Sequence, residues 1–303
     1  MTASDGGPGS DAGGGTLNTG EGGATFVAGS GADDGGVCGQ APVGGSRPVQ
    51  VRTFTTYNCN TPSPLVILLH DYASSGAEAE AYFNFAAQAD ALGFLYAHPD
   101  GTKDSQGNEF WNATDACCNV DGSTVDDSSY LATLLQQIHV QFNTDLDRVY
   151  VFGYGNGGFM AYRFACDHYL DVAVVADLGG ATWANPSKCA AKGPLTALEI
   201  HGTSDTTFAY DGGASLGAAY PSAPQTISQW VQLDRCDAGA VQGTGLDLLA
   251  DDAGTDTTVL QWPSCPLGSE MQLWSIQGGT HQPALSPTFA STLLTFVLAH
   301  KRP

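Results

Sequence analysis

The chain has 303 residues, with 10 Lys and Arg against 31 Asp and Glu and a formal charge of −21 at pH 7. A surface of that charge repels nucleic acid and anionic lipid, so neither is an expected partner. No apolar run approaches the roughly 18 residues of a membrane-spanning helix, and none is expected. The length suffices for one large domain with a substantial core, and no oligomeric state follows from it.

Residues 1–36 differ from the rest of the chain, with 13 glycines, five acidic residues and no basic residue. Such a segment cannot offset its ordering entropy by burial, which predicts a flexible acidic leader before a domain over residues 37–303. It lacks the basic and apolar regions of a signal peptide. We expect it to follow a removed signal or lipid anchor, in a secreted or cell-surface-tethered protein.

From residue 49 onward the pattern alternates between strands and helices. Residues 49–57 alternate like an antiparallel strand with one solvated face, whereas residues 64–69 are continuously apolar, as in a parallel strand buried on both faces. The later strands are expected over 94–97, 149–152, 172–178, 195–201, 259–262 and 271–276. Helices are expected over 77–92, from Thr124 through Ile138, and over 159–166, 226–233 and 287–300. This alternation predicts a doubly wound, mostly parallel sheet with helices on both faces.

The eight cysteines indicate an oxidising compartment. They allow about 105 pairings, and short loops close at the least entropic cost. The pairs with short loops are Cys38 with Cys59, Cys166 with Cys189, and Cys236 with Cys265. The adjacent Cys117 and Cys118 could bond to each other, to other cysteines, or to nothing.

The stretch over residues 149–158 reads as a strand, a glycine-rich turn and the start of a helix. This is the setting of the nucleophile elbow, in which G-x-S-x-G holds a serine on a strained turn. Here Gly155 stands at the nucleophile position. Covalent serine catalysis is therefore impossible at this turn.

Two further strand ends carry groups suited to catalysis. Asp205 follows the strand over 195–201, and His281 follows the strand over 271–276. The order elbow, Asp, His is that of α/β-hydrolases. His281 is the candidate general base, and Asp205 would hold its tautomer and stabilise the imidazolium. No metal-ligand spacing or cofactor motif occurs, so neither a metal nor an organic cofactor is expected.

Together these motifs resemble the secreted polyhydroxybutyrate depolymerase and feruloyl esterase-like α/β-hydrolases. The matching residues lie within about 38–300 and are His70, Pro99-Asp-Gly101, Trp111-Asn112, Val125-Asp-Asp127, Arg148-Val-Tyr150, Asn156-Gly-Gly158, His201-Gly-Thr-Ser-Asp205 and Gly278-Gly-Thr-His281. The resemblance implies an α/β-hydrolase fold. It also implies a carboxylic-ester hydrolase whose partner is an ester substrate or polymer, either a polyester or a feruloylated polysaccharide.

The resemblance assigns roles to further residues. The backbone N–H groups of Tyr72 and Asn156 would bind the oxyanion. Trp111 and Tyr154 are expected to line a cleft for the ester, and Trp183 is expected there or in ordinary packing. His70 and His201 are interpreted as structural.

The chain departs from the family at two positions, Gly155 and Asp71. The family has His-Gly where this chain has His70-Asp71, so Asp71 places a carboxylate near the expected oxyanion. An engineered knockout and natural loss both explain Gly155, and the second departure favours natural loss. The expected function is an esterase lineage that is inactive or strongly impaired. The alternative is a non-catalytic pseudoenzyme that binds a polyester, a feruloylated polysaccharide or a protein partner. A third option, water activated by His281, lacks the proximity of a covalent nucleophile.

Overall fold

The computed structural model describes residues 39, 41–189, 191, 193–237, 239–250 and 254–302. The predicted leader over residues 1–36 lies outside these ranges, as does Cys38. Within them, no helix has both the length and the apolar character needed to cross a membrane.

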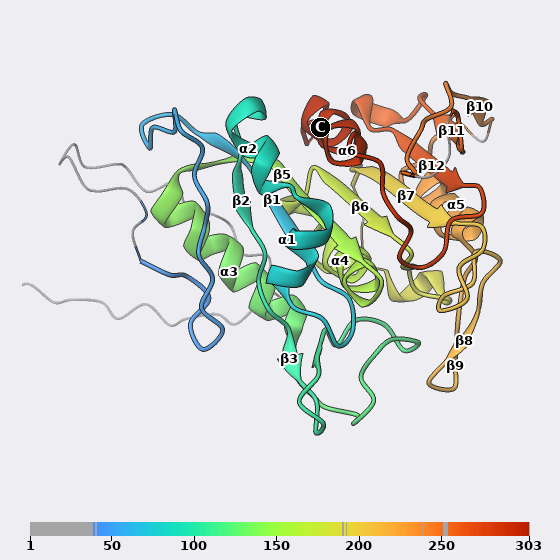
Figure 1. Cartoon of the computed structure of the whole chain (residues 1–303), viewed down its shortest axis with the longest axis horizontal. Coiled ribbons are helices and arrows are strands. Elements are labelled where there is room, and N and C mark those ends of the chain that lie inside the picture. The colour runs from blue at the N-terminus through green and yellow to red at the C-terminus, as the bar shows by residue number, and fades with distance from the viewer. Residues whose placement is uncertain are drawn as a thin grey trace, which may run out of the picture. The chain divides into compact units, whose positions relative to one another are not determined.

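An eight-stranded sheet forms the centre of the domain, and six adjacent strands run parallel (Figure 1). In order across the sheet the strands are β10 (Val241–Gln242), β11 (Thr257–Trp262), β12 (Met271–Ile276), β7 (Thr196–Gly202), β6 (Val174–Leu178), β5 (Thr144–Tyr154), β1 (Ser63–Leu69) and β2 (Leu95–Ala97). Among these described strands two pairs are antiparallel, β10 with β11 and β11 with β12. The predicted doubly wound, mostly parallel sheet is confirmed.

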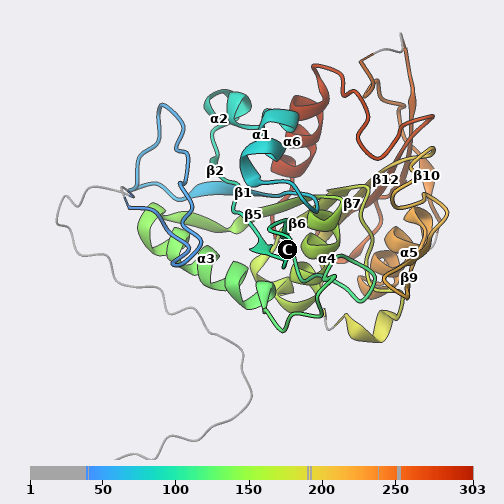
Figure 2. The ribbon, with the colours of Figure 1, turned by 60° about the horizontal axis from the view of Figure 1, so that its bottom comes forward.

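Helices cover both faces of this sheet (Figure 2). On one face lie α1 (Gly76–Phe83), α2 (Ala86–Leu92) and α6 (Phe289–Ala299), and on the other lie α3 (Asp127–Phe142), α4 (Asn156–Asp167) and α5 (Ala223–Leu233). Strand β1 alternates between the two cores: Leu65 and Ile67 face α3 and α4, whereas Val66 faces α1 and α2. Burial on both faces is the reason for its uninterrupted apolar sequence.

The strand order reverses between β1 and β5, because the chain passes from β1 to β2 on one side and then to β5 on the other. Loops at such a switch point leave the sheet in opposite directions and open a crevice beyond the carboxyl ends of the strands. Leu69 pairs with Gly153 at the ends of these two strands. The segments that follow them therefore emerge side by side.

Three local expectations are corrected. Residues 49–57 form no strand and contribute two isolated bridges, Val49 with Val43 and Arg52 with Tyr96, because the adjacent β2 has three residues and offers few pairing positions. The helix expected over 77–92 is divided at Asn84, whose φ of 54° places it in the left-handed region. The helix expected from Thr124 begins later, because α3 starts at Asp127 with Asp126 as its N-cap.

The sequence patterns also missed several short elements. These are the hairpin of β3 (Thr102–Lys103) and β4 (Glu109–Phe110), the hairpin of β8 (Gly213–Ser215) and β9 (Ala218–Tyr220), and the 3₁₀ turns over Tyr169–Asp171, Pro186–Lys188 and Pro266–Gly268. Two- and three-residue strands carry too little periodicity to be recognised from sequence.

Disulfides join Cys166 to Cys189 and Cys236 to Cys265, as loop closure predicted. The adjacent Cys117 and Cys118 bond to each other, which settles the question that their sequence left open. The expected partner of Cys59, Cys38, lies outside the described residues.

Replacing both Cys166 and Cys189 with alanine should lower the free energy of unfolding by about 3 kcal/mol. Their bridge closes a 23-residue separation and constrains the unfolded chain accordingly. Urea unfolding of the parent and the double variant, with the bridge in the parent verified by mass spectrometry, measures the difference. Equal stability of the two proteins would contradict a contribution from closing this loop.

Candidate active site

The turn between β5 and α4 has the backbone of a nucleophile elbow. Gly155 has φ 51° and ψ −116°, a backbone conformation that residues other than glycine rarely adopt. Close approach also demands glycine at position 157, where a Cβ would lie 2.1 Å from the carbonyl oxygen of Leu69. The predicted elbow is therefore present in its geometry, with no side chain at its apex.

The carboxylate of Asp71 occupies the space at that apex. A Cβ built on Gly155 would lie 2.1 Å from Asp71 Oδ1 and 2.4 Å from its Cγ. Asp71 and Gly155 are close because of the strand register. Leu69 is paired with Gly153, and Asp71 and Gly155 each lie two residues further along the chain. A nucleophile side chain at position 155 and Asp71 in this position exclude each other.

The two N–H groups expected to bind an oxyanion converge on the same carboxylate. The backbone N–H groups of Tyr72 and Asn156 each donate to Asp71 Oδ1 at 2.7 Å. The sequence had suggested only that Asp71 would bring charge near this place. The structure places a negatively charged oxygen at the meeting point of both donors, where an anionic oxygen is best stabilised.

His281 connects Asp71 to Asp205. Its Nδ1 lies 2.8 Å from Asp205 Oδ2, and its Nε2 lies 3.1 Å from Asp71 Oδ2. The strands that deliver Asp205 and His281, β7 and β12, are neighbours, and Gly202 is paired with Ile276 at their ends. The structure thus brings the predicted acid and base together, with Asp71 on the far side of the imidazole.

The charge state of His281 follows from these contacts. Burial alone would lower its pKa, but hydrogen bonds to Asp205 and Asp71 outweigh burial and raise the pKa to about 9. With both ring nitrogens facing carboxylate oxygens, the imidazole is a cation that donates to both. A neutral base of the kind that a serine triad requires is not the resting state at neutral pH.

His201 is a further partner of Asp205 that sequence reasoning had assigned to structure alone. Its Nδ1 lies 2.9 Å from Glu199 Oε1, and its Nε2 lies 2.8 Å from the carbonyl oxygen of Phe208 and 3.4 Å from Asp205 Oδ2. Burial would lower the pKa of His201, but these hydrogen bonds raise it to about 10. Burial would likewise raise the pKa of Asp205, yet hydrogen bonds from His201 and His281 hold it below its usual range. The sequence signal that could have revealed the contact with Glu199 is its spacing from His201, because residues two apart on a strand lie on the same face.

Stability should depend on pH through His281. Its folded pKa, about 9, lies above its ordinary value of 6.5, so the imidazolium contributes fully below pH 6.5 and the contribution is lost as pH rises through 9. The whole shift corresponds to about 3 kcal/mol. Urea unfolding between pH 6 and 10 should show the parent losing more stability than His281→Asn over this window. Parallel profiles for the two proteins would contradict the assigned charge.

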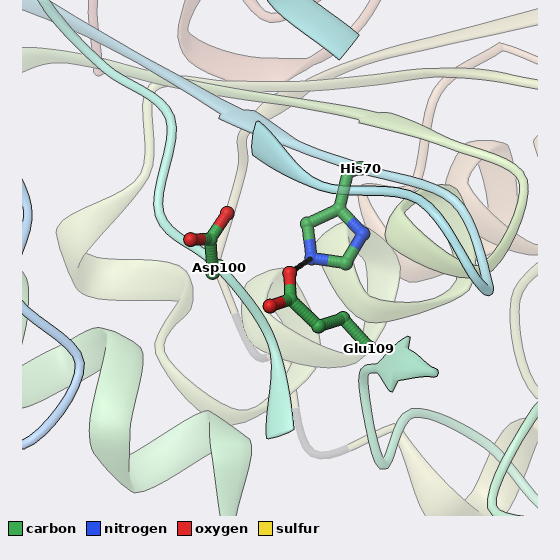
Figure 3. Close-up of side chains that lie close together, drawn as sticks. All are labelled: His70, Asp100 and Glu109. Carbon is green, nitrogen blue, oxygen red and sulfur yellow. Dashed lines mark ion pairs between the residues drawn. The ribbon is translucent and has the colours of Figure 1, made fainter. Parts of the chain in front are cut away.

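His70 anchors the loop that carries Asp71. The carbonyl oxygen of Asp71 lies 2.7 Å from His70 Nδ1, and the N–H of Gly101 donates to His70 Nε2 at 2.9 Å. Figure 3 shows Asp100 and Glu109 around this ring. One nitrogen of His70 and one carboxylate oxygen each of Asp100 and Glu109 lie within 4.8 Å of one another, which is close enough for the three to hold a metal ion. Because Nε2 already accepts from Gly101, the cluster is better explained as an anchor for the loop than as a metal site.

The three aromatic residues expected in the cleft have different positions. Trp111 is fully buried and donates from Nε1 to the carbonyl of His70, so its side chain does not line a cleft, contrary to expectation. Tyr154 stacks on His281 with ring centroids 5.2 Å apart. The centre of the Trp183 ring lies 4.8 Å from Lys188 Nζ, and Trp183 borders neither of the two cavities that adjoin Asp71.

Two cavities of about 400 Å³ and about 410 Å³ adjoin Asp71. The first is largely apolar, and its walls include Cys118, Phe208 and His281. The second is polar, and its walls include Tyr82 and Tyr154. Asp71 and Tyr72 border both cavities. A ligand in either cavity can therefore reach the carboxylate.

No protein-family model matches this chain. Feruloyl esterase B of Piromyces equi is 24% identical over 244 residues, which are 78% of this chain and 42% of that protein. Feruloyl esterase D of Neurospora crassa is 26% identical over 255 residues, 80% of this chain and 76% of that protein. Acetyl xylan esterase from Aspergillus awamori superposes with a TM-score of 0.56 at 16% identity, covering 82% of this chain and 93% of that one.

These comparisons confirm the fold and the feruloyl esterase part of the resemblance. The chain has the α/β-hydrolase fold, and its relatives are named as carboxylic-ester hydrolases of the feruloyl and acetyl xylan esterase type. It spans less than half the length of the Piromyces equi protein. The activity in the names of these relatives is therefore not assigned to this chain directly, and enters only as part of the proposed function.

Proposed function

We propose that this chain, related to carboxylic-ester hydrolases of the feruloyl and acetyl xylan esterase type, binds ester-bearing ligands without hydrolysing them through an acyl-serine intermediate. One observation carries the proposal: the Asp71 carboxylate fills both the nucleophile space at Gly155 and the meeting point of the Tyr72 and Asn156 N–H groups. An ester carbonyl has neither an attacking side chain at the elbow nor a free oxyanion hole.

The expected loss of rate is large. Loss of one oxyanion donor typically costs about 10²–10³ in rate. Loss of the nucleophile costs of order 10⁶ in the best-measured triad. Both are affected here, and His281 is held as a cation by two carboxylates. Ester hydrolysis by the serine route should therefore fall to background.

The fit between Gly155 and Asp71 supports natural loss over an engineered knockout. Asp71 can take its position only because residue 155 has no Cβ, which would lie 2.1 Å from Oδ1. A knockout of serine alone has no reason to meet a second, complementary change in a different loop.

The ligand class follows from the cavities and the relatives. The apolar cavity suits an acyl or aromatic group, and the polar one suits a hydroxylated alcohol portion. Relatives named feruloyl esterases favour a feruloylated polysaccharide. The motif resemblance to depolymerases keeps a polyester as the second candidate. Three disulfides in the described residues fit an extracellular location.

Ester hydrolysis should return only when both positions are changed. Gly155→Ser places a side chain against Asp71, and Asp71→Gly empties the oxyanion hole without supplying a nucleophile. Each single variant should hydrolyse p-nitrophenyl acetate at the background rate, and Asp71→Gly/Gly155→Ser should exceed either by at least about 10²-fold. Adding His281→Gln to the double variant, as the matched control, should return it to background.

Ligand binding is measured with the parent chain. Titration calorimetry with methyl ferulate and with a 3-hydroxybutyrate oligomer should give saturable binding of one ligand class, with chromatography showing no product. Hydrolysis of either ester by the parent that disappears in His281→Gln would overturn the proposal.

A further inference from the structure

Asp71 is held as a nucleophilic carboxylate would have to be held. We propose that Asp71 Oδ2 attacks a saturated electrophilic carbon, that of a small epoxide, and that the same site then hydrolyses the resulting Asp71 ester. This activity goes beyond the proposed binding function, since it gives the carboxylate that blocks ester hydrolysis a reaction of its own. Carboxylates are established covalent nucleophiles in enzymes of several classes.

The two oxygens of Asp71 have separate environments. Oδ1 accepts both backbone N–H groups, of Tyr72 and Asn156, at 2.7 Å. Oδ2 faces His281 Nε2 at 3.1 Å, and the side chain, 17% exposed, borders both cavities. One oxygen is therefore fixed by the backbone, and the other is open to a ligand.

This division determines which electrophile fits. If Oδ2 attacked an ester carbonyl, the new oxyanion on the substrate would find both N–H groups already bound to Oδ1. Attack on a saturated carbon forms no oxyanion on the substrate and needs no free hole. Afterwards Oδ1 becomes the carbonyl oxygen of an Asp71 ester and still lies between the two donors, where an oxyanion can form.

In the first step, an Oδ2 electron pair forms a bond to an epoxide carbon, and the carbon–oxygen bond of the ring breaks. The ring oxygen takes the electron pair and the Nε2 proton of the His281 imidazolium. His281 faces Oδ2 and is protonated at neutral pH, so it can supply this proton. An epoxide is the electrophile that fits, because its ring oxygen needs a proton when the ring opens. The products are an alkyl ester of Asp71 and a neutral imidazole.

In the second step, neutral His281 accepts a proton from water, and the hydroxide attacks Asp71 Cγ. The negative charge develops on Oδ1, between the N–H groups of Tyr72 and Asn156. The intermediate expels the product alkoxide, which takes the second proton of the original water. Epoxide and water have become a diol, and Asp71 and the His281 imidazolium are restored.

Gly155 and Asp205 complete the arrangement. Gly155 leaves room for the carboxylate at the apex of the elbow. Asp205 lies 2.8 Å from His281 Nδ1 and directs Nε2 toward Asp71. The acid and base are thus inherited from the hydrolase fold, and only the nucleophile comes from a different loop.

The test uses the whole chain, with styrene oxide as the probe, in heavy-oxygen water with protein in excess. In the first turnover heavy oxygen should enter the Asp71 side chain, detected by mass spectrometry of its proteolytic peptide, and the diol should carry light oxygen. His281→Asn should form the Asp71 adduct more slowly and retain it, since the water that would cleave it has no base. Asp71→Asn, which keeps the side-chain shape, should abolish both adduct and diol.

Asp115→Asn is the matched control, because Asp115 is an exposed carboxylate that pairs with Lys188 and borders neither cavity beside Asp71. It should leave adduct and diol unchanged, and melting temperatures verify that all variants fold. The proposal is overturned if the parent forms no diol from styrene oxide, if Asp71→Asn still forms diol, or if the heavy oxygen enters only the diol. These outcomes are independent of the ester assays, so failure here leaves the binding function standing.

Discussion

The hydrogen bonds that fix the Asp71 carboxylate determine the chemistry of the whole site. Two backbone N–H groups bind one oxygen and His281 faces the other. The sheet makes this arrangement possible, because β1 and β5 are neighbours at the point where the strand order reverses. Asp71 lies two residues beyond Leu69, the end of β1, and Gly155 lies two residues beyond Gly153, its partner in β5. The side chain of Asp71 therefore reaches the elbow.

Charge compensation extends from this carboxylate into the interior. Asp71, Asp205 and Glu199 alternate with His281 and His201, so each imidazolium lies between two carboxylates. Buried charges are tolerated when they are paired in this way. In a serine triad the base must be neutral to accept a proton, whereas here the extra carboxylate keeps it protonated. The Asp71 carboxylate that fills the space at Gly155 thus also keeps His281 protonated.

The sequence predicted the sheet, the elbow, and the meeting of Asp205 with His281, because strand periodicity and strand-end motifs report local structure directly. The sequence did not predict features that depend on the orientation of a side chain or on the pairing of strands far apart in the chain. Trp111 stands in a family motif, yet nothing in the sequence states that its ring points inward. Residues 49–57 alternate correctly but lack an adequate neighbouring strand. The occupation of the elbow by Asp71 required the register of Leu69 against Gly153.

The absence of serine at position 155 is only half of the change at this site. Restoring a side chain there would collide with the carboxylate, and removing the carboxylate would leave an elbow without any reacting group. Neither residue has a sensible role without the other, so they form a single unit drawn from two strands. Because the Asp71 carboxylate accepts the N–H groups of Tyr72 and Asn156 and faces His281, the contacts of the site support chemistry at this carboxylate, as proposed above.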